Sequence, residues 1–239
     1  MIQGIHQLTA SMVNQLNRVD TISNNIANAN TVGFKEDSLS EGSFNNYLDK
    51  KIENNESVSK LSLIMNTIPK IDGNYIDSKV GSIKTTGNKL DFALNHEDTF
   101  FKVQNSNGNI ELTRDGSFKI LDNFLVTQNG YKVLDKENNP IVTNNDAFAP
   151  NIAVVSTKFS NLDKIGNNNY KANDTQKLEV IENNDDYLLR GAVESSNVNG
   201  IKSMVTLIEA QRKFEQSQKA ITGIDEINKK VIDSIGNGR

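Results

Sequence analysis

The chain has 239 residues, enough for one large domain or two small ones, but only 36% of them are hydrophobic and 6% are aromatic, so its core is modest. The net charge is -4, with lysine and arginine spread along the chain, so there is no basic stripe of the kind that follows nucleic-acid phosphates, and we expect no nucleic-acid partner. The absence of cysteine excludes disulfides and thiolate metal sites.

The first residues do not have the pattern of a cleaved secretory signal. They lack a basic region followed by an unbroken apolar core, and no stretch of the chain approaches about 18 consecutive apolar residues. We therefore expect neither a Sec signal nor a membrane span.

Residues 3–29 are predicted to form a long amphipathic helix. Apolar residues recur at alternating three- and four-residue spacings, and Gln15 fills the one polar position of that series. The helix is expected to end in the stretch DTISNNIANANTVGFK, where Asn28, Asn30 and Gly33 can adopt left-handed or capping conformations. The apolar seam consists of Ile5, Leu8, Met12, Val19, Ile22 and Ile26.

The middle of the chain changes from a polar segment to a strand-like one. Residues 36–80 are poorly periodic and are interpreted as a linker with some local structure. From residue 100 to 134 the period falls to two, and a weaker strand pattern continues to about residue 183. Turn signals, which together predict a run of hairpins, occur at Asn107-Gly108, Asp115-Gly116 and Asn129-Gly130.

A second amphipathic helix is predicted at the end of the chain. Either Asn197 or Asn199 could cap its start, and Gly223 weakens the helix without ending it. Gln211 and Gln218 fall near the seam, and glycines after residue 235 close the helix. Its apolar face consists of Ile201, Met204, Val205, Ile208, Phe214, Ile221, Ile224, Val231 and Ile235.

These elements predict an α+β fold with three parts. A discontinuous terminal-helix domain comprises residues 1–35 and 197–239, a central β-rich domain of hairpins comprises residues 81–184, and residues 36–80 and 185–196 connect them. The two apolar stripes could bury each other within one chain or pack against other copies, and the pattern favours neither arrangement.

The chain carries no motif of an enzyme. It has no phosphate-binding loop, no zinc-protease motif and no nucleophile elbow. His6 lies within the first helix, and His96, beside Glu97, is interpreted as a solvated loop histidine. The acidic turns DGNYID and NNDD lack the spacing of a calcium loop. We therefore expect no catalytic residue, cofactor, metal or small-molecule substrate.

The asparagine-rich stretch at the end of the first helix resembles a known family signature. Residues 12–35 closely resemble the N-terminal signature of the bacterial flagellar rod and hook proteins, S-N-N-[LI]-A-N-x-N-T-x-G-[FY]-K. Three further blocks are similar to blocks of that family: TTGNKLDFAL, the segment from FFKV through LTRDGSFKI to LVTQNGYKVL, and LRGAVESSNVNGIKSMVTLIEAQRKFEQSQKAI. The motif residues are Ser23, Asn24, Asn25, Ala27, Asn28, Asn30, Thr31, Gly33, Phe34, Lys35, Glu194, Ser196, Asn197, Val198, Gln211, Arg212, Phe214 and Glu215.

The sequence departs from the family pattern at a few positions. Lys89 replaces a proline, Leu112 a tyrosine and Val193 a leucine, and Asn123 takes the place of a turn glycine. Asparagine adopts the left-handed conformation with modest strain, so Asn123 need not disturb its turn. Thr99 stands where the family usually has glycine, and because a β-branched residue resists that conformation we expect a local change of turn there.

The resemblance implies terminal helices paired as a coiled-coil inner domain, with the β-rich domain outside. It implies a structural subunit of the flagellar basal-body rod, which forms a homo-oligomeric helical assembly with other rod subunits and carries torque through the periplasm to the hook. Such subunits are exported by the flagellar type III machinery without a cleaved signal. The stretch QRKFEQSQKAI favours the proximal-rod FlgF type, and the alternatives are the distal-rod FlgG type and a self-contained soluble binding module with an intramolecular helix pair.

Overall fold

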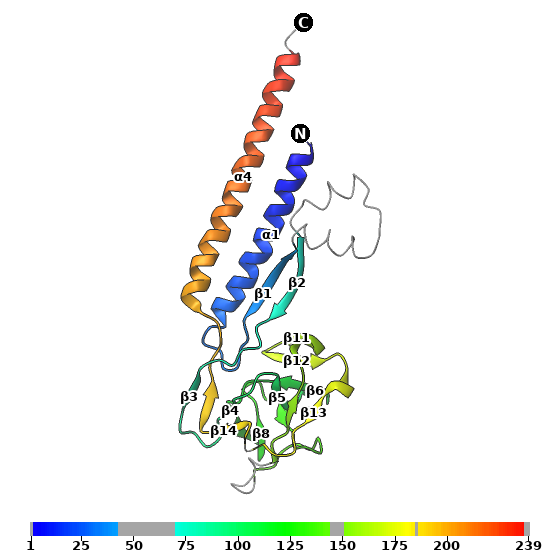
Figure 1. Cartoon of the computed structure of the whole chain (residues 1–239), viewed down its shortest axis with the longest axis vertical. Coiled ribbons are helices and arrows are strands. Elements are labelled where there is room, and N and C mark those ends of the chain that lie inside the picture. Colours follow the sequence, from blue (N-terminus) through cyan, green and yellow to red (C-terminus); the bar gives the residue numbers. More distant parts are fainter. Residues whose placement is uncertain (1, 43–69, 144–150, 185, 237–239) are drawn as a thin grey trace. The chain divides into compact units, whose positions relative to one another are not determined.

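The computed structural model describes residues 2–42, 70–143, 151–184 and 186–236, and its elements are labelled in Figure 1. The chain divides into two compact units. Unit 1 consists of Met1–Ile26, Asp37–Tyr75 and Asn199–Arg239, and unit 2 of Ala27–Glu36 and Ile76–Val198. Both units therefore combine segments that are distant in sequence.

Unit 1 contains the two long helices. Helix α1 spans Ile2–Ala27 and helix α4 spans Gly200–Gly236, so both predicted helices are present. Strands β1 (Asp37–Gly42) and β2 (Lys70–Ile76) pair with each other. They occupy the two ends of the segment predicted as a linker, and residues 43–69 of that linker lie outside the described residues. No described helix has both the length and the apolar character needed to cross a bilayer.

The end of α1 is close to its predicted position but is built differently. Gly33 has the left-handed conformation, with φ of 67°, whereas Asn28 and Asn30 do not have positive φ. The Asn28 side chain instead accepts a hydrogen bond from the Thr31 hydroxyl at 3.1 Å, and the Asn28 carbonyl accepts one from the Thr31 N–H at 3.1 Å. The polar side chain thus stabilises the turn by bonding to it.

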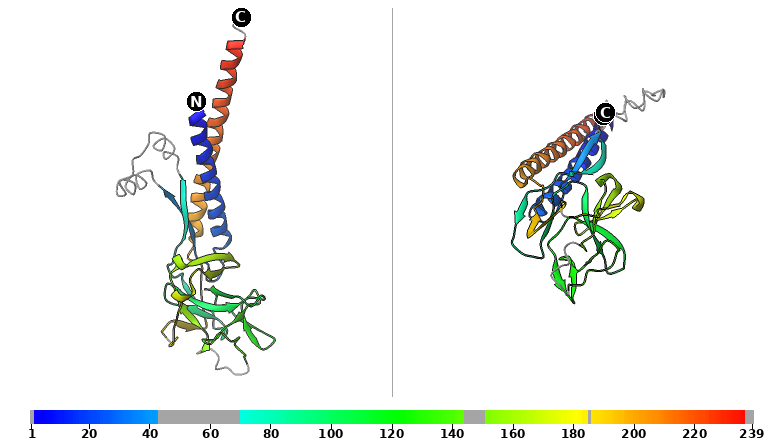
Figure 2. Two further views of the ribbon diagram at one scale, coloured as in Figure 1. Left: turned by 90° about the vertical axis from the view of Figure 1, so that its right-hand side faces the viewer. Right: turned by 60° about the horizontal axis from the view of Figure 1, so that its bottom comes forward.

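Asn199, and not Asn197, caps the start of α4. The Lys202 N–H donates to Asn199 Oδ1 at 3.1 Å, which satisfies one of the free N–H groups of the first turn. As predicted, Gly223 lies within α4 without ending it, and Figure 2 shows α4 as one uninterrupted helix.

Unit 2 is built on a nine-stranded antiparallel sheet. The strand order is β11-β12-β6-β5-β9-β8-β7, with β10 beside β5 and β13 beside β10. The strands are β5 (Thr99–Gln104), β6 (Ile110–Thr113), β7 (Lys119–Leu121), β8 (Phe124–Val126), β9 (Lys132–Val133), β10 (Val154–Ser156), β11 (Leu162–Gly166), β12 (Asn169–Ala172) and β13 (Glu179–Val180), with short 3₁₀ helices at Phe159–Asn161 and Thr175–Lys177. The two helices together with this sheet confirm the predicted α+β class.

Two small sheets bring later residues of the chain back to unit 2. Strand β14 (Leu188–Arg190) pairs with β4 (Phe92–Leu94), and β15 (Ala192–Glu194) pairs with β3 (Ile83–Thr85). Residues 185–196, which we expected to be a connecting region, therefore contribute two strands. Residues 27–36 also belong to this unit.

Two of the three predicted hairpin turns are confirmed and one is wrong. Gly108 and Gly130 have φ of 83° and 82° in the turns between β5 and β6 and between β8 and β9. Gly116 instead lies against β4, where the Phe92 N–H donates to its carbonyl at 2.9 Å. A Cβ at Gly116 would lie 1.8 Å from the Phe92 oxygen, so this glycine permits a close approach of two backbones and not a hairpin.

The departures from the family pattern are accommodated locally. Asp122 and Asn123 have φ of 50° and 65° between the paired strands β7 and β8, as a type I′ turn requires, which confirms the expectation for Asn123. The expected change of turn at Thr99 stays a prediction. Asp98 takes the left-handed conformation with φ of 55°, and Thr99 continues the strand opposite Ser156.

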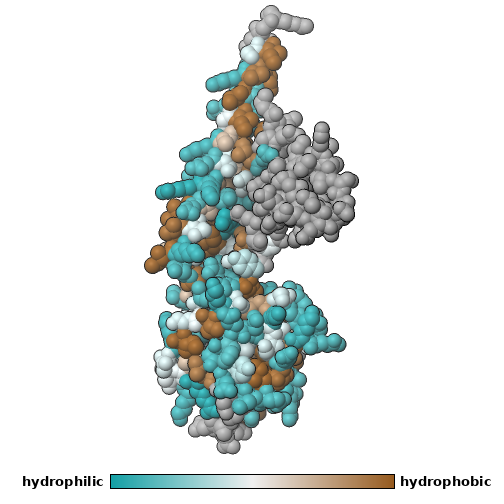
Figure 3. All heavy atoms as spheres, in the orientation of Figure 1, coloured by the Kyte–Doolittle hydropathy of each residue, from teal (hydrophilic) through white to brown (hydrophobic). Residues whose placement is uncertain are grey.

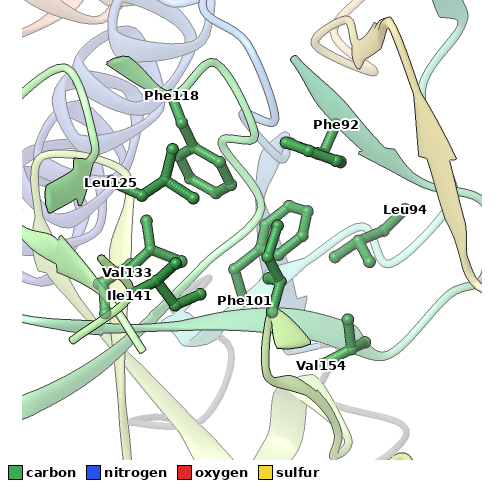
Figure 4. Packing of buried hydrophobic residues seen from close by; sticks show 10 residues of the cluster. Phe92, Leu94, Phe101, Phe118, Leu125, Val133, Ile141 and Val154 are labelled. Atoms are coloured by element: carbon green, nitrogen blue, oxygen red, sulfur yellow. The ribbon is translucent and has the colours of Figure 1, made fainter. Parts of the chain in front are cut away.

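The core of unit 2 lies on both faces of β5. Figure 4 shows the larger cluster, in which Phe101 packs among residues from several strands. Phe100, the preceding residue, belongs to a second cluster with Leu112 and Tyr170. Successive residues of a strand point to opposite faces, so the two phenylalanines anchor one strand in two cores. The larger cluster consists of Phe92, Leu94, Phe101, Val103, Phe118, Leu125, Val133, Ile141, Ile152 and Val154.

Candidate functional site

A buried ion cluster joins three distant segments of unit 2. Glu194, at the end of β15, has 1% of its side chain exposed. Its Oε1 atom lies 2.8 Å from Lys35 Nζ, and its Oε2 atom lies 2.7 Å from Arg114 Nη2. The Gly81 N–H also donates to Oε1 at 2.8 Å. Because a buried charge is costly unless it is paired and hydrogen-bonded, this arrangement meets the requirement for all three side chains.

Backbone carbonyls complete the coordination of the two cations. Arg114 donates to the carbonyl oxygens of Leu94 at 3.2 Å, His96 at 2.9 Å and Thr99 at 2.8 Å. Lys35 Nζ donates to the Lys79 carbonyl at 2.5 Å. The two cations thereby fix the backbone of the loop before β5 and of the segment before β3, in addition to pairing with Glu194.

The ion cluster contains two cations and one carboxylate. Burial lowers the pKa of Lys35, and the charge of Arg114 lowers it further, while Glu194 opposes both effects. Glu194 is therefore the group on which both cations depend.

Gly33 allows the N-terminal segment to reach this cluster. Its N–H donates to the Glu194 carbonyl at 2.8 Å, and its φ is 67°. A Cβ at this position would lie 2.4 Å from the backbone carbon and oxygen of Arg114. Both the conformation and the space therefore require glycine.

Asn197 fastens the last segment of unit 2 before α4. Its Oδ1 accepts from the Glu36 N–H at 2.7 Å. Its Nδ2 donates to the carbonyls of Asp77 at 3.0 Å and Lys79 at 3.2 Å. This one amide therefore links the chain that follows α1 with the chain that leads into β3.

The remaining residues of the N-terminal motif have separate roles. Asn25 in unit 1 is buried, and its amide donates to the Asp37 carbonyl at 2.7 Å and accepts from the Asp37 N–H at 3.0 Å. Phe34 in unit 2 is buried, with Lys164 Nζ 4.0 Å from its ring centroid. Ser23, Asn24, Ala27 and Asn30 are exposed.

The C-terminal motif residues fall into two groups. In unit 2 the Ser196 hydroxyl accepts from the Val198 N–H at 3.2 Å, which stabilises the turn that follows β15. On α4, Phe214 is half-buried, whereas Gln211, Arg212 and Glu215 are exposed. Within the described part of the chain, no side-chain hydrogen bond or ion pair gives these exposed three a structural role.

The predicted seam of α1 is the covered face of that helix in the structure. Gln15 and Ile22 are buried, and the side-chain oxygen of Gln15 has no hydrogen-bond partner among the described residues. By contrast, Val13 and Leu16 on the other side of α1 are half exposed, at 51% and 50%. The other seam residues are half-buried: Ile5, Leu8, Met12, Val19 and Ile26.

The predicted apolar face of α4 separates into two stripes. The covered stripe repeats at three- and four-residue spacings and consists of Ser203, Leu207, Ala210, Phe214, Ser217, Ile221, Ile224 and Asn228, all buried or half-buried. The exposed residues of the predicted face are Ile201, Met204, Val205, Ile208, Val231 and Ile235. Gln211 and Gln218 are exposed and do not lie on the covered stripe. Val231 and Ile235 continue the three-four spacing of the covered stripe beyond Asn228 but are exposed, whereas the second stripe consists of Ile201, Met204, Val205 and Ile208, of which Ile201 is 80% exposed.

Sequence reasoning did not identify Arg114 as a site residue. The only signal was the LTRDG block, whose arginine reads as an ordinary exposed charge until the fold brings Glu194 to it. His96 is exposed, as predicted, and its backbone carbonyl, not its ring, contributes to the cluster. Among the residues that the structure describes, no three histidine, aspartate or glutamate side chains are placed to hold a metal ion.

Three family descriptions match separate parts of the chain. "Flagella basal body rod protein" matches residues 10–35, "Flagellar hook protein FlgE/F/G D1 domain" matches residues 96–160, and "Flagellar basal body rod FlgEFG protein C-terminal" matches residues 189–234. Lys35, Arg114 and Glu194 lie one in each of these regions. The ion cluster therefore connects the three matched regions in space.

Full-length relatives match over nearly the whole chain. The flagellar hook-basal body complex protein FlhO of Bacillus subtilis is 30% identical, over 99% of both chains. The flagellar basal-body rod protein FlgF of Rhizobium meliloti is 28% identical, over 100% of both. The flagellar basal-body rod protein FlgG of Borreliella burgdorferi is 30% identical, over 95% of this chain and 96% of its own.

Proposed function

Because the chain belongs to the flagellar basal-body rod protein family, of FlgF/FlgG type, we propose that it polymerises through its terminal helices into the axial shaft that carries torque from motor to hook. The observation that carries this proposal is the exposed apolar stripe of α4. A helix that leaves Ile201 80% exposed and Ile208 49% exposed gains by burying them against a neighbour.

The covered stripes support a coiled-coil pairing of α1 with α4. Both helices belong to unit 1, and their covered residues follow the same three-four spacing, which is the spacing of a two-helix seam. A pairing of this kind leaves the opposite faces of both helices for other subunits. The seam residues named above, from Ile5 to Ile235, stay our proposed interface residues, the covered ones for pairing within unit 1 and the exposed ones for contacts between subunits.

The buried ion cluster supports a mechanical role. Lys35 follows α1 and Asn197 precedes α4, so the cluster and its neighbour fix both chain segments that connect unit 2 to the helices. A subunit that transmits torque needs these connections to resist displacement, and multiply bonded buried charges supply that resistance. We propose that the ion cluster holds the two connections in place during rotation.

Within the family we propose the proximal-rod FlgF type. The Phe214-Glu215 pair supports that assignment, and relatives named FlgF and FlgG have similar identities. We also propose that the flagellar type III machinery exports the chain without cleavage.

Deletion of the gene tests the role in the rod. We expect cells without it to lack rods, hooks and motility, and a tagged full-length chain to be present in isolated basal bodies. Motile deletion cells, or basal bodies that lack the chain, would contradict the proposal. Basal bodies from cells that lack the distal-rod subunit should still contain a FlgF-type chain. A FlgG-type chain would itself be the distal-rod subunit and would therefore be absent from those cells.

A further inference from the structure

We propose that the C-terminal end of α4 packs beside the first turns of α4 in a second copy of this chain, with the two helices parallel. The inference rests on the proposed function, because it specifies one contact between rod subunits. It starts from Val231 and Ile235, two residues of the predicted apolar face that continue the covered stripe of α4 and yet are exposed.

The α4 tip, which consists of Val231, Ile232 and Ile235, is an exposed apolar surface. These residues are 44%, 68% and 75% exposed. Helices α1 and α4 belong to the same unit and have 26 and 37 residues. Figures 1 and 2 show them side by side and antiparallel, with α4 extending beyond the start of α1. The covered stripe ends at Asn228, so the tip lies past the part of α4 that α1 accompanies.

The first turns of α4 carry an exposed apolar set with the same spacing as the tip. Met204, Val205 and Ile208 are 54%, 53% and 49% exposed. The first two are adjacent and the third follows three residues later, and the α4 tip repeats this spacing. Figure 3 shows hydrophobic side chains at both ends of α4. Each end of the helix therefore presents the same pattern of apolar residues on one side.

The polarity of the assembly sets the direction of the pair. In a helical assembly whose subunits share one polarity, α4 of every copy runs in the same direction, so two α4 helices meet in parallel. Equal spacing then places Ile208 of one copy beside Ile235 of the other, with the two adjacent pairs in contact one turn earlier. The second copy is displaced along the helix by about 27 residues, or about 40 Å at about 1.5 Å per residue.

The contact joins two different ends of the same helix, so it can repeat from copy to copy. When the first turns of one α4 are covered by the tip of another, its own tip is still exposed and can bind a third copy. A contact of this head-to-tail kind builds a filament and not a closed dimer. Both matching surfaces are present in this one sequence, which is why the partner is a second copy.

Helix α1 of a second copy fits the tip less well. In the same assembly α1 runs antiparallel to α4, so its apolar residues would have to follow the reversed spacing, at positions i, i+3 and i+4. Among the described side chains of α1, the exposed set that comes nearest to this spacing is Val13, Leu16 and Asn17. Asn17 would place a polar amide against the tip, and a buried amide costs free energy unless it is hydrogen-bonded. The observations therefore favour α4 as the occupant.

Cysteine cross-linking tests the contact directly, because the natural chain contains no cysteine. Two full-length versions with different epitope tags, Ile208→Cys and Ile235→Cys, are produced together, and basal bodies are isolated under oxidising conditions. A disulfide forms only when the two Cα atoms are within about 7 Å. We expect a dimer that carries both tags and is lost on reduction. The control pair, Val13→Cys with Ile235→Cys, tests α1 as the occupant and should give no such dimer.

A single chain that carries both Ile208→Cys and Ile235→Cys tests whether the contact repeats. Each copy can then be joined at both ends of α4, so we expect a ladder of multimers that collapses to the monomer on reduction. A dimer with nothing larger would contradict the head-to-tail arrangement.

The outcomes separate this inference from the proposed function. A cross-link in the control pair alone, a cross-link to a protein of different mass, or no cross-link in basal bodies that contain both chains would overturn the pairing of α4 helices and leave the rod subunit intact. If the tagged natural chain were absent from basal bodies, both the pairing and the proposed function would be wrong.

Charge substitution supplies an independent test. Ile235→Asp and Ile208→Lys should each abolish swimming, since each places an unpaired charge in the apolar contact, and the double variant should swim again. Ser234→Asp, an exposed change beside the tip, should swim normally. Single variants that swim, or a double variant that stays non-motile while each single chain is stable and exported, would overturn the pairing of these two residues.

Discussion

The two units of this chain differ in what they leave to solvent. In unit 2, Phe100, Phe101 and Leu125 are fully buried, and even the ionic side chains of Arg114 and Lys35 are inaccessible. In unit 1, α4 exposes large apolar residues along much of its length. Unit 2 therefore encloses a core of its own, whereas α4 of unit 1 leaves an apolar face uncovered. The modest number of hydrophobic residues thus forms one enclosed core in unit 2 and one exposed apolar face on α4.

This difference separates the sources of stability. We expect changes in the core of unit 2 to weaken that unit without affecting the helix surfaces, and changes on the helix surfaces to leave the core of unit 2 intact. Variants placed in one unit at a time test that separation.

Loss of the central carboxylate should have the largest effect on unit 2. Glu194→Gln keeps the shape of the side chain but leaves Lys35 and Arg114 buried without a counter-charge. We expect the free energy of unfolding to fall by about 3–5 kcal/mol. Urea unfolding followed by the fluorescence of the tyrosines, of which Tyr170 is fully buried, measures the change.

A matched control for this variant is Glu137→Gln, at an exposed position in the same unit. It should change the free energy of unfolding by less than about 0.5 kcal/mol. If Glu194→Gln behaved like the control, the ion cluster would not stabilise unit 2, and its proposed mechanical role would lose its basis.

The close approach of Gly33 to Arg114 predicts the next largest effect. Gly33→Ala adds a Cβ 2.4 Å from the Arg114 backbone and also places alanine at φ of 67°, so we expect a loss of about 2–4 kcal/mol. Gly130→Ala is the matched control, because Gly130 has φ of 82° but open space around it. It should lose only about 1 kcal/mol from backbone strain. Equal losses would show that the contact with Arg114 is not limiting.

These contacts also show what could be predicted from the sequence. Helix spacing and turn dipeptides predicted both helices, the strand-rich middle and two of three hairpins, because those signals are local. Asp115-Gly116 misled because a glycine that permits close packing has the same sequence signature as one that permits a turn. The spacing of apolar residues showed that α4 is amphipathic. It did not distinguish the covered stripe of α4 from the exposed one, because both follow three-four spacing.

The ion cluster could not be predicted in this way. Lys35, Arg114 and Glu194 are separated by about 80 residues at each step, and nothing in the composition around them indicates burial. Resemblance to the family identified Lys35 and Glu194 as motif residues without giving their roles. The pairing of β15 with β3 holds Glu194 in place, and Lys35 and Arg114 reach its carboxylate from two other segments.

The pH dependence of unit 2 should show a smaller effect, through Asp115. Burial raises the pKa of this carboxyl group, against the lowering effect of its hydrogen bonds from Ser117. The folded state then holds its proton at pH values where the unfolded state has lost it, so this contribution to stability is present below the unfolded pKa and is lost as pH rises through the folded pKa. We expect the stability of the natural chain, relative to Asp115→Asn, to fall as pH rises above about 4. Urea unfolding of both chains across acidic pH measures the difference, and parallel curves would contradict the assignment.

The smallest effect on unit 2 is expected from a change that should matter most to unit 1. Ile22 is buried on the covered seam of α1, and Ile22→Asp would place a carboxylate there, at a cost of several kcal/mol to the helix packing of unit 1. Because Ile22 and the core of unit 2 belong to different compact units, we expect the unfolding of unit 2, followed by tyrosine fluorescence, to stay within about 0.5 kcal/mol of the natural chain.

The far-ultraviolet helical signal should meanwhile decrease, and cells that carry Ile22→Asp should lack rods. Ser23→Asp, an exposed neighbour on the same helix, should leave the helical signal unchanged. If Ile22→Asp instead lowered the stability of unit 2 by as much as Glu194→Gln does, the two units would unfold as one cooperative structure. The chain would then be a closed module whose helices do not depend on contacts with another subunit.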